Sequence, residues 1–335
     1  MKAWEIRDNF GLENLKLADR AELQPGPGQV LVRVRAVSLN YRDLMVSKGW
    51  YNPKQKLPLV PCSDGAGEVV AIGEGVKSVK PGDRVMSCFF QRWQNGELSD
   101  VDARSTLGSP ADGMLREFAV LEEFGVIPTP SFLTDVEAST LPCAALTAWQ
   151  ALVTLGKIKA GDTVLVQGTG GVSIFALQFA VKSGARVIAT SSSDEKLQRA
   201  IELGASDGIN YKTTPNWEKR VRELTGGIGV DHVVEVGGAG TLSKSVIAVR
   251  RSGTVSLIGV LSGPGDFNPL PILMNGTRVQ GIFVGSRSMF ADMNRAIELH
   301  KIHPVVSDVF AFDQSPDAFQ LMERGGHFGK ICISL

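Results

Sequence analysis

Between Pro142 and Pro215 the chain contains no proline, and short β-branched runs alternate there with amphipathic stretches. Residues 163–167 form one apolar run, residues 172–182 continue with helical periodicity, and residues 186–190 form the next apolar run. Segments of this length in this order are typical of βαβ units. Because the crossover in such a unit is right-handed and places its two strands parallel, the segment predicts a parallel sheet covered by helices.

The alternation of predicted strands and helices continues toward the C-terminus. Further strands are predicted at 207–210, 231–236, 254–258 and 278–284, with helices at 196–203 and 217–224. Together with the first two strands they suffice for a doubly wound sheet.

The first 130 or so residues follow a different pattern, in which short strands are separated by turns. Strands are predicted at 30–37 and 67–73, and a Pro-Gly turn at 81–82 leads into a third. This pattern predicts a barrel-like β domain. Residues 91–113 are polar and rich in turn residues, so a long surface loop is expected there. The tail 289–335 is expected to return to the β domain as helix, strand, helix and strand.

Charge balance and cysteine usage narrow the class of protein. Lys plus Arg and Asp plus Glu both number 35, and the pI is about 6.9, so neither nucleic acid nor an anionic membrane is an expected partner. The four cysteines are scattered, the N-terminus lacks a signal-peptide core, and no apolar run reaches the roughly 18 residues of a membrane helix. We therefore expect a cytoplasmic protein that acts on a small molecule.

A glycine-rich turn joins the first predicted strand of the parallel sheet to its helix. It consists of Gly168, Thr169, Gly170, Gly171 and Val172. Glycines at such a turn let the backbone approach a pyrophosphate, which the helix N-terminus attracts. The third glycine of the commoner G-x-G-x-x-G pattern is missing, so an ordinary βα turn remains an alternative on spacing alone. Its place in a βαβ series favours dinucleotide binding.

The residues at the end of the second strand indicate which dinucleotide binds. NAD enzymes place a carboxylate about 20 residues beyond the glycines, on the ribose hydroxyls. Here that place is held by Ser191, followed by Ser192, and Lys196 follows in the next helix. Small hydroxyls leave room for a 2′-phosphate and a lysine supplies charge, so NADPH is predicted. A polar loop with a solvated Lys196 is the alternative.

Several motifs occur in a fixed order over nearly the whole chain. They are Asn40-Tyr41-Arg42-Asp43, Cys62-Ser63-Asp64-Gly65-Ala66-Gly67, Pro81-Gly82-Asp83-Arg84-Val85, Leu141-Pro142-Cys143-Ala144-Ala145, the glycine turn, and Gly329-Lys330-Ile331. In these motifs the chain resembles the zinc-independent, quinone oxidoreductase-like branch of the medium-chain dehydrogenase/reductase (alcohol dehydrogenase) family. The resemblance implies an α/β protein. It has a GroES-like β-barrel catalytic domain at 1–128 and 287–335, and a Rossmann domain, a doubly wound parallel sheet, at 129–286.

The resemblance also bears on metal binding. The zinc branch of the family holds its catalytic metal with two cysteines and a His-Glu pair, and the matching positions here are Asn40, Ser63-Asp64 and Cys143. Since a catalytic zinc takes three protein ligands and keeps one position open, no catalytic zinc is expected. Residues 91–113 contain no cysteine, so no structural zinc is expected either.

Residue roles follow from the same resemblance. It implies catalytic roles for Asn40, Tyr51 and Asp64. It implies cofactor contacts for the glycine-turn residues Gly168 to Val172 and for Thr147, Ser191, Ser192, Lys196, Tyr211, Gly259, Arg324 and Lys330. Ordinary roles remain open for several of them: Asn40 in a turn, Tyr51 in a loop, Tyr211 at a strand end and Arg324 on a solvated helix face.

The predicted function is that of an NADPH-dependent oxidoreductase. A site without metal must stabilise a developing oxyanion with hydrogen-bond donors, or act on substrates that delocalise the charge, such as quinones and α,β-unsaturated carbonyls. A metal-free alcohol or aldehyde dehydrogenase and an NADPH-binding protein with little catalysis remain alternatives. The resemblance further implies a homodimer formed through the strand at 278–284.

Overall fold

The computed structural model describes residues 1–259, 261, 263 and 265–335. Its contacts divide the chain into two compact units. The β-rich unit comprises Met1–Leu146 and Gly285–Leu335, and the parallel-sheet unit comprises Thr147–Val284. The domain boundaries predicted at 128/129 and 286/287 stay a prediction.

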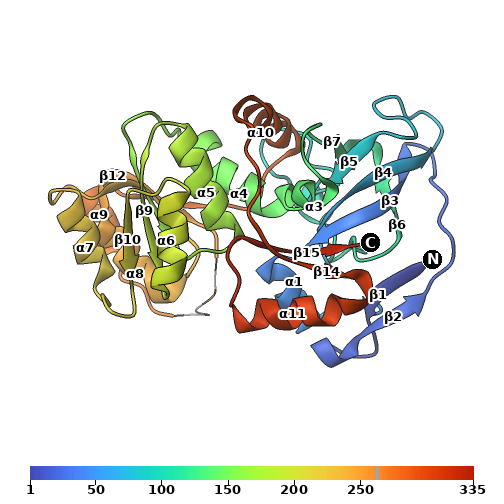
Figure 1. The fold of residues 1–335 in the computed structure, drawn as a ribbon, viewed down its shortest axis with the longest axis horizontal. Coiled ribbons are helices and arrows are strands. Elements are labelled where there is room, and N and C mark those ends of the chain that lie inside the picture. Colours follow the sequence, from blue (N-terminus) through green and yellow to red (C-terminus); the bar gives the residue numbers. More distant parts are fainter. Residues whose placement is uncertain (260, 262, 264) are drawn as a thin grey trace. The chain divides into compact units, whose positions relative to one another are not determined.

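The parallel-sheet unit is built on one six-stranded sheet (Figure 1). In spatial order its strands are β10 (Asp207–Asn210), β9 (Arg186–Ser191), β8 (Thr163–Gln167), β11 (Val230–Glu235), β12 (Val249–Leu257) and β13 (Arg278–Gly281). All neighbours pair in parallel. The predicted doubly wound parallel sheet is confirmed.

Helices connect these strands. They are α5 (Gly171–Lys182), α6 (Asp194–Glu202), α7 (Trp217–Leu224), α8 (Ala239–Ala248) and α9 (Leu270–Asn275), while α4 (Leu146–Trp149) precedes β8. Helix α5 packs on β8 and β9, α6 on β9 and β10, and α8 on β11 and β12 (Figure 1). Helix α5 is apolar almost throughout and largely buried, whereas α6 and α7 carry charged outer faces.

The strand order places the glycine turn at a distinctive point of the sheet. Strand β8 has β9 on one side and β11 on the other, so the chain crosses the sheet in opposite directions from β8. Gly168 follows β8 directly. The carboxyl end of the strand at such a reversal is where doubly wound sheets bind ligands.

The β-rich unit contains a seven-stranded sheet and a separate two-stranded pair. In spatial order the main sheet has β14 (Val306–Ala311), β15 (Lys330–Ser334), β3 (Gln29–Ser38), β4 (Asp64–Ile72), β5 (Arg84–Ser87) and β7 (Val126–Pro128), with β6 (Phe118–Glu122) also on β3. Strands β1 (Lys2–Ile6) and β2 (Leu15–Asp19) form the pair, and the helices are α1 (Tyr41–Ser47), α2 (Asp100–Ala103), α3 (Asp135–Ala138), α10 (Arg287–His300) and α11 (Ser315–Arg324). Because β14 and β15 join β3, the predicted return of the tail is confirmed. No helix in the part of the chain that is described is both long and apolar enough to span a bilayer.

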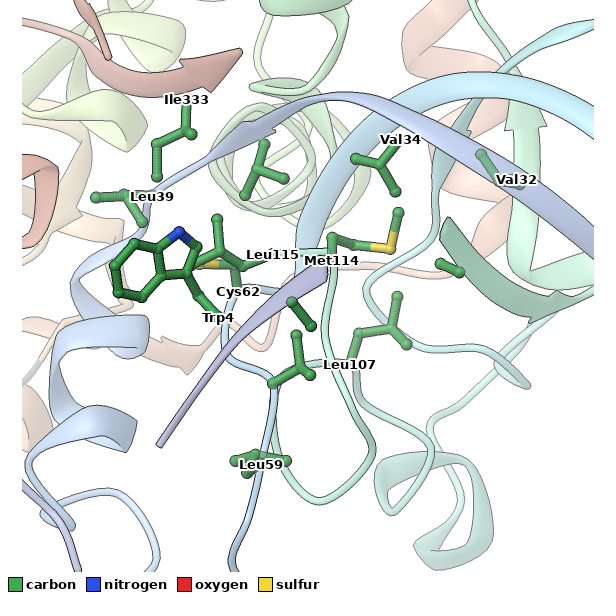
Figure 2. Close-up of a cluster of buried hydrophobic side chains, with 14 of the residues drawn as sticks. Trp4, Val32, Val34, Leu39, Leu59, Cys62, Leu107, Met114, Leu115 and Ile333 are labelled. Carbon is green, nitrogen blue, oxygen red and sulfur yellow. The ribbon is translucent and has the colours of Figure 1, made fainter. Parts of the chain in front are cut away.

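A cluster of buried apolar side chains forms the core of this unit (Figure 2). Leu39 and Cys62 belong to it, with exposed fractions of 1% and 0%. Each directly precedes a polar residue, Asn40 after Leu39 and Ser63 after Cys62. Burial of the apolar neighbours therefore helps to fix the positions of these polar groups, which are themselves buried.

The long surface loop predicted at 91–113 is only partly correct. The segment contains α2, and its residues 106–109 are buried. Arg42 holds that stretch through backbone carbonyls, donating from Nη1 to Leu107 O at 3.0 Å and from Nη2 to Ser109 O at 2.6 Å. A distant arginine satisfies carbonyls that a free loop would present to water.

Candidate active site

Three segments of the β-rich unit meet at the end of β3. Strand β3 lies between β4 and β15, with Ser38 opposite both Asp64 and Cys332. Asn40 follows β3 and precedes α1, Asp64 begins β4, and Lys330 begins β15. The pairing of three strands therefore brings together residues that are far apart in sequence, and their side chains are all at least nine-tenths buried.

Lys330 fixes the orientation of the Asn40 amide. The Lys330 ammonium donates to Asn40 Oδ1 and to Leu39 O, both at 2.6 Å. A lysine cannot accept a hydrogen bond, so it must face the oxygen of the amide. The Nδ2 donor of Asn40 is consequently turned the other way, to the side of Asp64, whose pKa the amide lowers; within 3.5 Å it has no hydrogen-bond partner among the described residues.

Asp64 is a fully buried carboxylate in the same cluster. Its Oδ1 accepts from Ser63 Oγ at 2.6 Å and its Oδ2 from the Cys143 backbone N at 3.0 Å. Burial raises the pKa of Asp64, while the nearby Lys330 ammonium opposes that rise. Asp64 is thus held by donors on both oxygens and by a cation in a region that otherwise excludes water.

Asp43 is a second buried carboxylate beside the cluster. Its Oδ2 accepts from the Asn40 backbone N at 2.8 Å, which closes the first turn of α1, and its Oδ1 has no hydrogen-bond partner in the described chain. Burial raises the pKa of Asp43 to about 6, with Arg42 pulling in the opposite direction. This carboxyl is therefore unusually costly to ionise.

The raised pKa predicts a pH dependence of stability. Because folded Asp43 binds its proton more tightly than the unfolded chain does, the free energy of unfolding should fall as pH rises from about 4 to 7. Asp43→Asn keeps an acceptor for the Asn40 N–H and removes this dependence. The stability difference between wild type and Asp43→Asn should change by about 3 kcal/mol over that range, as measured by urea unfolding at a series of pH values. A difference that stays constant with pH would contradict it, and Asp292→Asn on exposed α10 serves as control.

Tyr51 contacts Arg42, the neighbour of Asp43. It follows α1, is 38% exposed, and its ring lies 4.6 Å from the guanidinium carbon of Arg42. No hydrogen bond joins it to Asn40, Asp64 or Lys330 among the described residues. Its catalytic role stays a prediction.

The donor set of this cluster does not fit a zinc ion. Of the positions that match the zinc ligands, only Asp64 and Cys143 carry zinc-type donors, whereas a catalytic zinc takes three protein ligands. The Lys330 ammonium adds a positive charge in the same place. The described residues contain no group of three or more His, Cys, Asp or Glu side chains arranged for a metal.

The glycine turn of the parallel-sheet unit has open space over its backbone. Gly168 adopts φ +69°, which favours glycine, and Gly170 is the residue before α5. A Cβ added at Gly170 would have no atom within 4 Å. The backbone angles of Gly170 are ones that any residue can adopt. The space above it, at the N-terminus of α5, is open, and a pyrophosphate needs such space to approach the backbone amides.

Of the residues assigned to the 2′-phosphate, all but Arg324 belong to the ends of two neighbouring strands and the helix that follows one of them. Ser191 ends β9 opposite Asn210 of β10, and the backbone N of Tyr211 donates to Ser191 O at 3.0 Å. Ser192 follows, and the first turn of α6 carries Lys196, whose pKa is lowered by partial burial. The structure thus brings Ser191, Ser192, Lys196 and Tyr211 together.

Other assigned residues are more dispersed. Thr147 is buried in α4, and Gly259 follows β12, where an added Cβ would lie 1.9 Å from Val236 O. Arg324 ends α11 in the β-rich unit, as Lys330 begins β15 there. Their cofactor contacts stay predictions, and the observed partners of Lys330 are Leu39 and Asn40.

Glu235 is a site residue that sequence reasoning missed. It ends β11 fully buried, and its carboxylate accepts from Gln167 Nε2 at 2.8 Å, Gly237 N at 2.8 Å and Gly238 N at 3.0 Å. These bonds tie the end of β11 to the end of β8, next to the glycine turn. An acidic residue closing an apolar strand is the sequence signal that could have identified it.

Comparisons with known proteins agree with this architecture. Residues 26–131 match the family model described as alcohol dehydrogenase GroES-like domain, and residues 171–300 match the one described as zinc-binding dehydrogenase. A zinc-type alcohol dehydrogenase-like protein of Schizosaccharomyces pombe is 45% identical over 92% of this chain and 91% of its own. A quinone oxidoreductase of Rattus norvegicus is 28% identical over 100% of this chain and 98% of its own. A mycobacterial protein solved in complex with NADPH is 28% identical, with TM-score 0.85 over 100% of both chains.

These matches span both units and include alcohol dehydrogenases and quinone oxidoreductases. The parallel sheet with its glycine turn and the GroES-like β-rich unit are the two parts that such enzymes combine. The chain therefore belongs to the medium-chain dehydrogenase/reductase family and is an oxidoreductase of the alcohol dehydrogenase-like type.

Proposed function

We propose that the protein is a zinc-independent, NADPH-dependent reductase of quinones or α,β-unsaturated carbonyls. The observation that carries this proposal is the Asn40–Lys330 contact: an amide and an ammonium stand where the zinc branch of the family places a metal ligand. A site built this way offers an oriented hydrogen-bond donor in place of a Lewis acid.

The choice of cofactor rests on the end of β9. No carboxylate stands at Ser191, and Ser192 and Lys196 provide hydroxyl and positive charge. A mycobacterial relative was solved with NADPH and another solved relative is described as NAD-dependent, so the choice rests on these residues. Gly168 to Val172 would hold the pyrophosphate, and Ser191, Ser192, Lys196 and Tyr211 the 2′-phosphate.

The residues of the β-rich unit would act on the developing charge. The site would receive a hydride from NADPH when that cofactor is bound, and the substrate oxygen would then gain negative charge that conjugation spreads. Asn40 Nδ2, the donor without a partner, would donate to that oxygen, and Lys330 keeps the amide in the required orientation. Asp64 balances the charge of Lys330. Protonation would follow from water or from Tyr51, whose ring is partly exposed.

A cofactor-by-substrate matrix combined with metal analysis tests the proposal. We expect NADPH to be oxidised with quinones or enones, at a rate that EDTA does not change, by protein that carries much less than one zinc per chain. Tightly held stoichiometric zinc or a clear preference for NADH would overturn it. Turnover of simple alcohols without quinone reduction would favour an alcohol dehydrogenase, and binding without turnover would favour a non-catalytic role.

A charge substitution tests the 2′-phosphate site. Replacing Lys196 by methionine should raise the KM for NADPH roughly 10-fold to 100-fold, because a charge-assisted contact to phosphate contributes about 1.5–3 kcal/mol. The KM for NADH should stay unchanged, since NADH lacks that phosphate. Lys219→Met, on the exposed side of α7, is the matched control. Equal effects on both cofactors would contradict the assignment.

A homodimer through β13 is the proposed assembly. Strand β13 ends the sheet with an unpaired edge, and Leu273, Met274 and Phe283 near it are 76%, 66% and 41% exposed. Light scattering coupled to size exclusion should give twice the chain mass of 35.9 kDa, and Leu273→Glu with Met274→Glu should give the monomer. Leu299→Glu, equally exposed at 76% on α10, should leave the dimer intact. A monomeric wild type would rule the dimer out.

A further inference from the structure

A hollow of about 510 Å³ lies within the β-rich unit, away from the residues assigned above. Its walls come from the 91–112 segment and from strand β6 with the residues before it. Three arginines line it: Arg92, Arg104 and Arg116. Its volume is in the range of small-molecule sites.

Arg116 is the unusual member of this group. It is only 7% exposed, and it follows Leu115, which lies in the apolar core of Figure 2. Its guanidinium donates no hydrogen bond to any described residue, and its nearest charge partner, Asp112 Oδ2, lies 3.9 Å from Nη1. Burial lowers the pKa of Arg116 to about 10, so it remains a cation at neutral pH. A buried cation with this little compensation is costly to the folded protein.

The carboxylates that line the hollow are already engaged. Asp112 Oδ2 accepts from Arg20 Nη1 at 2.6 Å, and its Oδ1 accepts from the Val60 backbone N at 2.9 Å. Glu122 Oε1 accepts from Gln29 Nε2 at 3.3 Å. Arg92 and Arg104 are exposed, and their side chains form no ion pair within the described residues. Three arginines against two carboxylates leave the lining of the hollow with a positive balance of charge.

The rest of the wall is apolar. Val101, Leu107 and Leu121 face the hollow beside the arginines. A wall of this composition fits a molecule with an apolar body and one anionic end, because a guanidinium pairs with two oxygens of a carboxylate or phosphate at once.

We infer that this hollow binds a small organic anion, with a carboxylate or phosphate against Arg116 and an apolar body against Val101, Leu107 and Leu121. The inference is independent of the proposed function, since every residue that carries it lies outside the Asn40 cluster and the glycine turn. The site would serve a second ligand rather than the reacting substrate.

Thermal unfolding with three probes tests the inference. Hexanoate and hexyl phosphate represent the two anionic groups on one apolar body, and sodium chloride at matched ionic strength controls for screening. At about tenfold excess over its Kd, a bound probe should raise the Tm by roughly 3–6 °C. Whichever of the two organic probes acts at lower concentration identifies the anionic group. A shift that chloride reproduces, or no shift, would overturn the inference.

Substitutions locate the effect. Arg116→Met should abolish the probe-dependent shift while leaving the protein without probe as stable as wild type or more so, since it removes an uncompensated buried cation. Arg295→Met, 79% exposed on α10, should keep the full shift. Should Arg116→Met fail to fold, Arg104→Gln at the exposed rim decides: it should weaken probe binding about tenfold. Unchanged binding in the folded variants would show that the anion binds elsewhere and would refute the assignment.

Discussion

Replacing Lys330 by methionine is expected to lower kcat about 100-fold, with a smaller effect on the KM for NADPH. The ammonium holds Asn40 Oδ1 and Leu39 O, so its loss leaves two buried acceptors without a donor and frees the amide to rotate. A misoriented donor at a developing oxyanion costs about 2.7 kcal/mol of transition-state stabilisation. Steady-state kinetics with NADPH and a quinone measure the loss. If instead the KM for NADPH rises while kcat is unchanged, Lys330 contacts the cofactor and does not position Asn40.

The same substitution should also destabilise the β-rich unit by about 2–4 kcal/mol, because Asp64 stays buried without its nearby cation. Adding Asp64→Asn removes that uncompensated carboxylate. The double variant should therefore recover part of the stability that Lys330→Met loses, but little of the activity, since Asn40 remains free to rotate. If the stability losses of Lys330→Met and Asp64→Asn simply add in the double variant, the two charges do not interact.

The fold was largely accessible from sequence because its signals are local. Each βα repeat can be recognised from a short window of sequence. All six strands of the parallel sheet occur where the sequence pattern predicted them. The role of Lys330 is different in kind. It is 290 residues from Asn40 in sequence, and only the pairing of β15 with β3 brings the two together. The sequence pattern predicted Lys330 at the start of a strand, but it did not indicate that Asn40 would be the partner of this lysine.

The burial of certain charged residues was the second feature that the sequence did not predict. Asp43, Glu235 and Arg116 occur in ordinary-looking sequence, where an acid or a base is commonly solvated. Their isolation from water arises from tertiary packing, which no single window of sequence records. The 91–113 segment illustrates the same limit: its polar composition predicted a surface loop, but Arg42 reaches it from α1 and satisfies its carbonyls.

Two glycines of the parallel-sheet unit should respond to alanine in opposite ways. At Gly170 an added Cβ meets no atom within 4 Å and the φ of −77° suits any residue, so stability should change by less than about 1 kcal/mol. The methyl group would, however, occupy the cradle proposed for the pyrophosphate. The affinity for NADPH should fall about 100-fold, because phosphate must approach the backbone amides closely. Fluorescence titration with NADPH and urea unfolding of the same preparation measure the two quantities.

At Gly259 the added Cβ would lie 1.9 Å from Val236 O and 2.7 Å from its carbonyl carbon. Backbone atoms cannot yield as a flexible side chain does, so Gly259→Ala should cost more than about 4 kcal/mol of stability. If the Gly259→Ala variant still folds, its affinity for NADPH should fall only as far as the substitution displaces β11 and β12. A stable Gly170→Ala with wild-type affinity would remove the pyrophosphate from this turn. A stable Gly259→Ala that loses NADPH would instead give Gly259 a direct cofactor contact, because affinity would then have changed without any cost to the fold.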